Sequence, residues 1–118
     1  MYCAPNPATA LLEVLAHSSI DLEDMPVDFR YLEVEAPGTL AVEDLDTAAL
    51  PPSWRTDLAA TRRAGDEWLQ SGRAALLRVP SVIVPATWNV LINPRHPESA
   101  QLRIVRAHSH GRDPRLLW

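Results

Sequence analysis

Eleven prolines spread along 118 residues constrain the fold of this chain more than any other feature. Proline ends or kinks helices and is excluded from the interior of central strands, so the chain is divided into short pieces. This pattern argues against a bundle of long helices. A doubly wound parallel sheet would need more crossover helices than the sequence offers. We therefore expect a mixed α/β (α+β) fold, with a partly antiparallel sheet and a few short helices.

Two segments have the pattern of a helix. The first runs from about residue 8 to 17, with Asn6 as its N-cap and Pro7 at its first helical position. The second spans roughly residues 55–70 and contains Gly65. Glycine costs about 1 kcal/mol relative to alanine inside a helix. We therefore expect Gly65 either to split this helix or to allow the close approach of another backbone.

The expected strands are short, apolar or alternating runs. They cover residues 2–4, 29–35, 40–42, 75–79, 82–84, 90–92 and 102–107. A proline-interrupted connection spans residues 45–54. Single helical turns are expected at residues 97–100 and 113–115, where Asp113 precedes Pro114 as Asn6 precedes Pro7.

Charge and composition exclude several classes of protein. Eleven arginines against fifteen acidic residues give a net charge of −4, which argues against a protein that coats nucleic acid. Cys3 is the one cysteine, so no intrachain disulfide can form. No apolar run approaches the roughly 18 residues of a membrane span, and the first residues lack the basic start of a signal peptide. We expect a cytoplasmic protein that does not enter a membrane.

Metal and phosphate motifs are also lacking in the sequence. His108 and His110 share one flank, but no third ligand has usable spacing, so we expect no metal site. With four glycines in the chain, a glycine-rich phosphate loop cannot be built.

Glu13 stands out on the first helix. Helical spacing puts four apolar residues on one face, namely Ala8, Leu11, Leu12 and Leu15. Glu13 lies beside this face, where a carboxylate loses part of its hydration unless a partner or ligand compensates. One interpretation is a solvated glutamate on the outer face, paired with His17 four residues on. The other is a carboxylate kept for function.

Three polar residues interrupt the apolar β region. Ser81 follows Pro80 between two apolar runs and could contact a ligand's phosphate or ribose, or cap a turn. No G-x-S-x-G motif surrounds it, which argues against a hydrolase nucleophile. Asn89 and Asn93 bracket another apolar run. Their amides either satisfy backbone groups at the strand ends or shape the wall of a pocket.

Four stretches in this order resemble the RES-domain family. They are YCAPNPATALLEVLAH at residues 2–17, LRVPSVIVP at 77–85, NVLINPRHP at 89–97 and RDPRL at 112–116. The resemblance covers nearly the whole chain as one domain.

The resemblance implies a fold similar to that of ADP-ribosyltransferases and a role as the toxin of a bacterial toxin–antitoxin pair. RES proteins consume NAD+ by hydrolysis or phosphorolysis of the nicotinamide–ribose bond, or transfer ADP-ribose to a protein. The implied partner is an antitoxin with a DNA-binding domain, in a complex that holds a homo-oligomer of the toxin. A truncated, inactive domain that only binds the antitoxin is the alternative.

The resemblance also assigns site residues. The family places a tyrosine eleven residues before a helical glutamate, and Tyr2 and Glu13 match in type and spacing. Tyr2 would stack on nicotinamide, and Glu13 would hold the ribose hydroxyls and stabilise an oxocarbenium-like centre. Ser81 matches the family's serine, which would contact phosphate or ribose.

One departure concerns the family's pyrophosphate-binding arginine. In the family it lies on a segment before the tyrosine, whereas this sequence starts one residue before Tyr2. A start codon assigned too late, or a remnant gene, would account for the difference. Arg30 and Arg78 are candidates to replace the arginine.

Overall fold

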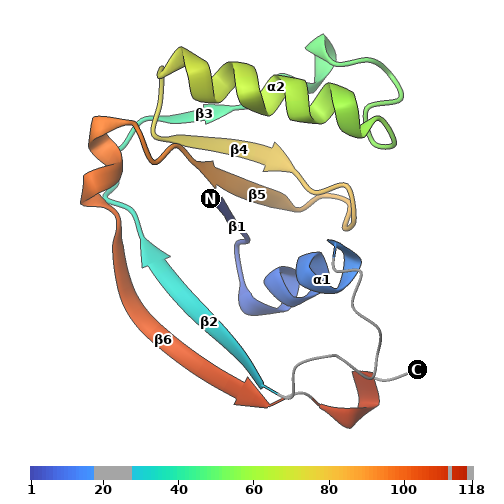
Figure 1. Cartoon of the computed structure of the whole chain (residues 1–118), viewed down its shortest axis with the longest axis vertical. Coiled ribbons are helices and arrows are strands. Elements are labelled where there is room, and N and C mark those ends of the chain that lie inside the picture. Colours follow the sequence, from blue (N-terminus) through green and yellow to red (C-terminus); the bar gives the residue numbers. More distant parts are fainter. Residues whose placement is uncertain (18–27, 112, 117–118) are drawn as a thin grey trace.

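The computed structural model describes residues 1–17, 28–111 and 113–116. Figure 1 shows the arrangement of its strands and helices. In order they are β1 (Tyr2–Cys3), α1 (Pro7–His17), β2 (Asp28–Glu35), β3 (Val42–Asp44), α2 (Leu58–Ser71), β4 (Leu76–Pro80), β5 (Trp88–Ile92) and β6 (Arg103–Gly111). Short 3-10 helices lie at Thr47–Ala49, Pro97–Gln101 and Pro114–Leu116. The expected mixed α/β class is confirmed.

Four strands form the main sheet, in the order β1-β5-β4-β3. β3 runs parallel to β4, whereas β4 and β5, and β5 and β1, are antiparallel. Tyr2 is opposite Leu91, which brings the first residues of the chain beside a strand far along the sequence. The partly antiparallel sheet therefore matches the expectation.

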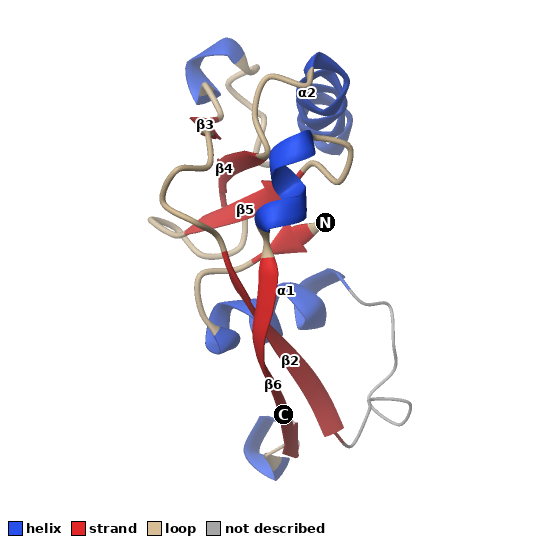
Figure 2. Cartoon of the chain, turned by 90° about the vertical axis from the view of Figure 1, so that its left-hand side faces the viewer, coloured by secondary structure: helices blue, strands red, loops and turns tan. Residues whose placement is uncertain are grey.

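The remaining two strands form a separate antiparallel ribbon. β2 and β6 pair from Asp28 opposite Gly111 to Glu35 opposite Arg103, with an irregularity between Glu33 and Val34. Figures 1 and 2 show this ribbon standing apart from the main sheet, with α1 beside it. A two-stranded ribbon alone has little stability, so it depends on packing against the rest of the molecule.

Both helices begin after a capping side chain. Asn6 Oδ1 accepts a hydrogen bond of 2.8 Å from the Thr9 amide, and Asp57 accepts one of 3.0 Å from the Ala60 amide. α2 ends at Gly72, whose φ of 63° is the left-handed conformation that glycine adopts readily. Gly65 neither splits α2 nor meets another backbone, since a Cβ built there would find no atom within 4 Å. Both expectations for Gly65 were wrong.

The core is formed by residues of the main sheet and of the loops that lead into its strands. Its buried cluster consists of Leu40, Ala75, Leu76 and Ile92, with Cys3, Val90 and Leu102 packed against it. On α2, Ala60 and Trp68 are the buried residues. No helix in the described ranges is long and apolar enough to cross a membrane.

One expected strand is absent. Residues 82–84 lie in the loop between β4 and β5, in which Ala86 has a positive φ of 62°. The amides of Ile83 and Val84 bond to the Ser81 hydroxyl instead of a neighbouring strand. Apolar composition alone therefore predicted the wrong structure here, because a serine side chain took over the backbone bonds.

Candidate active site

The Glu13 carboxylate is buried, with 6% of the residue exposed. The inward face of α1 carries Thr9 and Glu13, which lie four residues apart, whereas Leu12 and Val14 are about half exposed. Of the expected apolar face, Ala8 and Leu12 are exposed, whereas Leu11 and Leu15 are half-buried, so the face is only partly covered. The expectation of a solvated glutamate was wrong. The side chain of His17 lies outside the described residues.

Ser81 reaches Glu13 from the loop after β4. Its hydroxyl donates a hydrogen bond of 2.8 Å to Glu13 Oε1 and accepts bonds of 3.1 Å from the amides of Ile83 and Val84. Only 1% of Ser81 is exposed. The hydroxyl thus caps the turn, as one interpretation held, and also holds the carboxylate.

Asn89 on β5 is the second donor to Glu13. Its Nδ2 donates to Glu13 Oε1 at 2.9 Å and to the Tyr2 hydroxyl oxygen at 2.6 Å. The residue is fully buried, at 0% exposed. One amide nitrogen therefore contacts both Glu13 and Tyr2, which lie 76 and 87 positions before Asn89 in the sequence.

Tyr2 is the exposed member of this group, at 47%. Burial of the phenol, and then the nearby Glu13 carboxylate, raise the pKa of Tyr2 above its ordinary value, while the hydrogen bond from Asn89 opposes them. The phenol is therefore protonated at neutral pH. Tyr2 offers both a ring face for stacking and a hydroxyl proton.

The structure brings together all three residues that the sequence assigned to the site: Tyr2, Glu13 and Ser81. Asn89 was given two interpretations and no site role. Its signal was an amide at the edge of an apolar run that becomes a central strand, where a polar side chain requires a partner. Asn93 follows the first interpretation instead, since it bonds to the backbone of Leu69 and Arg95.

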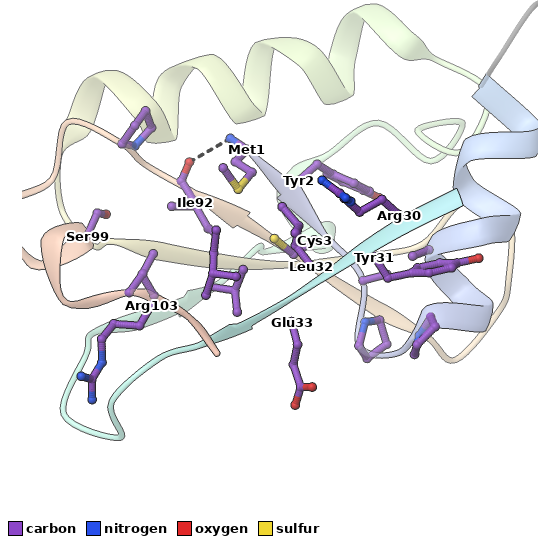
Figure 3. Close-up of a pocket in the computed structure, with 18 of the residues that line it drawn as sticks. Met1, Tyr2, Cys3, Arg30, Tyr31, Leu32, Glu33, Ile92, Ser99 and Arg103 are labelled. Atoms are coloured by element: carbon purple, nitrogen blue, oxygen red, sulfur yellow. Dashed lines mark hydrogen bonds between the residues drawn. The ribbon is translucent and has the colours of Figure 1, made fainter. Parts of the chain in front are cut away.

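A cavity of about 1120 Å³ lies between β1, α1 and the β2–β6 ribbon. Tyr2 lines it, whereas Glu13, Ser81 and Asn89 are not among its lining residues. Figure 3 shows Tyr2, Arg30 and Tyr31 along this cavity. Tyr2 therefore links the cavity to the buried side chains of Glu13, Ser81 and Asn89. We assign the chemistry to these buried side chains because their polar atoms converge on Glu13 Oε1.

The two replacement arginines differ in position. Arg30 on β2 lines the cavity, as Tyr2 does. Arg78 is paired with Asp44 at 3.1 Å and lies over the ring of Trp88, 5.0 Å from its centroid. Of the two, Arg30 is the one placed to meet a ligand in the cavity.

In a family comparison, the RES domain matches residues 1–118 of this chain. This chain belongs to the RES family. The resemblance inferred from its motifs is thus confirmed.

Several curated RES toxins are similar over most of the chain. "Toxin Res" of Pseudomonas putida is 43% identical over 88% of this chain and 70% of its own length. "Prs ADP-ribosylating toxin" of Sphingobium sp. (strain YBL2) is 36% identical over 99% of this chain and 74% of its own. "Toxin Res" of Yersinia enterocolitica is 35% identical over 98% and 76%.

Proposed function

We propose that this RES protein is a toxin that consumes NAD+ by breaking the nicotinamide–ribose bond. The electron pair of the C–N bond moves to the nicotinamide nitrogen, which leaves as neutral nicotinamide. The ribosyl carbon becomes an oxocarbenium-like cation, and water, phosphate or a protein side chain bonds to it and loses a proton. The observation that carries this proposal is the buried Glu13 carboxylate, held by Ser81 and Asn89 beside Tyr2.

Glu13 supplies the negative charge that this reaction needs. A fixed carboxylate stabilises positive charge that develops on the ribose in the transition state. Its attraction is stronger where water is excluded, and Glu13 is 6% exposed. The two donors on Oε1 hold the carboxylate in one orientation, so little reorganisation is required during the reaction.

The cavity suits the rest of the substrate. Tyr2 presents a half-exposed ring at its edge, on which nicotinamide can stack. Apart from histidines, the charged side chains among its described lining residues are Glu33, Arg30, Arg95 and Arg103. This excess of arginine, in a chain of net charge −4, favours the pyrophosphate of a dinucleotide.

The name of the Sphingobium relative describes ADP-ribosylation by that protein. ADP-ribosyl transfer from NAD+ breaks the same nicotinamide–ribose bond that we propose for this chain. Glu13 assists the breakage of the nicotinamide–ribose bond. The acceptor, which is water, phosphate or a protein, reacts with the ribosyl carbon after that step.

The test is product analysis on the purified protein. We expect NAD+ to be converted to free nicotinamide, with ADP-ribose, ADP-ribose phosphate or labelled protein identifying the acceptor. A metal chelator should leave the rate unchanged, because the proposed chemistry uses no metal ion. NAD+ that remains intact with all three acceptors present would contradict the proposal.

We also propose an antitoxin partner with a DNA-binding domain, bound to a homo-oligomer of this toxin in the cytoplasm, where NAD+ is available. Exposed apolar side chains on α1, Leu12 and Val14, offer it a contact surface next to Glu13. Co-expression with the product of a neighbouring helix-turn-helix gene should yield a complex that protects NAD+. A complex formed by a protein without NAD+ turnover would instead indicate a module that only binds its antitoxin.

A further inference from the structure

Asn89 engages two site residues with one amide group. A side-chain NH2 has two hydrogens, and those of Asn89 are directed at Tyr2 Oη and Glu13 Oε1, at 2.6 and 2.9 Å. Asn89 is fully buried, and so is its bond to Glu13, whereas its bond to Tyr2 is partly buried. The relative position of the phenol and the carboxylate is therefore set by a single planar group.

The orientation of this amide carries a cost. Asn89 Oδ1 is buried and has no hydrogen-bond partner in the described part of the chain. Exchanging the oxygen and nitrogen positions would turn Oδ1 toward the Glu13 carboxylate, where two acceptors repel. An unpaired buried carbonyl costs stability and is rare in native proteins, so the orientation of Asn89 requires an explanation.

Asn93, just beyond the other end of the same strand, shows what a purely structural asparagine does. It is 2% exposed, donates to the Leu69 carbonyl at 3.3 Å and accepts from the Arg95 amide at 3.1 Å. Both ends of its amide serve the backbone. Asn89 differs because both of its donors serve side chains of the candidate site.

The bond from Asn89 also determines what the Tyr2 hydroxyl can do. Because the phenol oxygen accepts this bond, the phenol proton is not used in it and is available to another acceptor. Tyr2 lines the cavity, where a bound substrate would present such an acceptor.

We propose that Asn89 is a positioning residue of the RES reaction: it fixes the Glu13 carboxylate and directs the Tyr2 hydroxyl to donate a hydrogen bond to bound NAD+. This proposal rests on the proposed NAD+ cleavage. Asn89 itself does not touch the substrate, since it is fully buried behind Tyr2 and Glu13.

The first test follows Tyr2 directly and needs no activity. The chain has two tyrosines, so Tyr31→Phe leaves Tyr2 as the one phenol whose ionisation changes the ultraviolet absorbance. In this background, Asn89→Leu should move the Tyr2 titration to higher pH, because the bond from Asn89 favours the phenolate. Asn93→Leu, the matched control, should leave the titration in place. If Leu variants do not fold, Asn89→Thr and Asn93→Thr replace them, because a threonine hydroxyl can donate to one partner at most.

The second test is kinetic. Loss of the bond to a charged group should lower kcat for NAD+ cleavage about 10- to 100-fold in Asn89→Leu, with a smaller change in KM. Asn93→Leu should retain the activity of its folded fraction. A Tyr2 titration unmoved by Asn89 substitution, or equal effects of the two asparagines, would overturn the inference. Failure of the wild-type protein to cleave NAD+ would overturn the proposed function instead, and the titration would still judge the positioning of Tyr2.

Discussion

The Ser81 hydroxyl donates a hydrogen bond of 2.8 Å to Glu13 Oε1, and so joins the β4–β5 loop to helix α1. The Ser81 hydroxyl oxygen also accepts hydrogen bonds from the amides of Ile83 and Val84. One hydroxyl therefore fixes the turn and the carboxylate together, which makes the position of Glu13 depend on the fold of this loop.

Substitution Ser81→Ala tests this dependence. It leaves two amides without their acceptor and Glu13 without one donor, so we expect the free energy of unfolding to fall by about 1–3 kcal/mol. NAD+ cleavage should fall about tenfold, as expected for one lost bond to a charged group. Chemical denaturation and steady-state rates measure the two effects.

Ser71→Ala is the matched control, because Ser71 also bonds to backbone groups, at the end of α2 and outside the site. It should reduce stability without lowering the rate of the folded protein. An equal loss of rate in both variants would contradict the role given to Ser81.

The raised pKa of Tyr2 predicts a loss of stability in alkali. In the unfolded chain the phenol ionises near pH 10, whereas in the folded protein it ionises at a higher pH, so the folded state binds more protons between the two values. The free energy of unfolding should therefore be unaffected below about pH 9 and fall as the pH rises through and above 10. Tyr2→Phe should flatten this fall.

These measurements belong in a Cys3→Ala background, because burial raises the pKa of the Cys3 thiol and produces an alkaline fall of the same sign. A fall of equal steepness with tyrosine and phenylalanine at position 2 would contradict the burial of the phenol.

Arg30 is predicted to bind the substrate's pyrophosphate. Arg30→Ala should raise KM for NAD+ about tenfold or more, because a charge-assisted bond to phosphate is lost. Arg106→Ala is the control, since Arg106 is on the same ribbon but is not among the residues that line the cavity. Substrate titrations that give both variants the KM of the wild type would remove Arg30 from the site.

Much of the fold could be predicted from local sequence. Asn6 and Pro7 marked the start of α1, and the runs expected at residues 75–79, 90–92 and 102–107 became β4, β5 and β6. The failures came from interactions across the chain. The segment 82–84 is apolar, but Ser81 binds its amides, and the β2–β6 ribbon is separate from the main sheet, which no local pattern indicates.

The site residues, too, were predicted only in part. Tyr2, Glu13 and Ser81 were identified through the resemblance to the RES family, whereas spacing on the helix alone placed Glu13 beside an apolar face that is largely outside the core. Asn89 was missed as a site residue, because its partners lie 76 and 87 positions away and only the pairing of β1 with β5 brings them together.

The central claim is that Glu13 drives the loss of NAD+. The most direct measurement is the NAD+ content of cells that express the wild-type chain, Glu13→Gln, or the exposed-site control Glu67→Gln, at equal levels of folded protein. We expect NAD+ to fall with the wild type and with Glu67→Gln, and to be retained with Glu13→Gln, which keeps the shape of the side chain but removes its charge. Equal depletion of NAD+ by Glu13→Gln and the wild type would contradict the role given to Glu13.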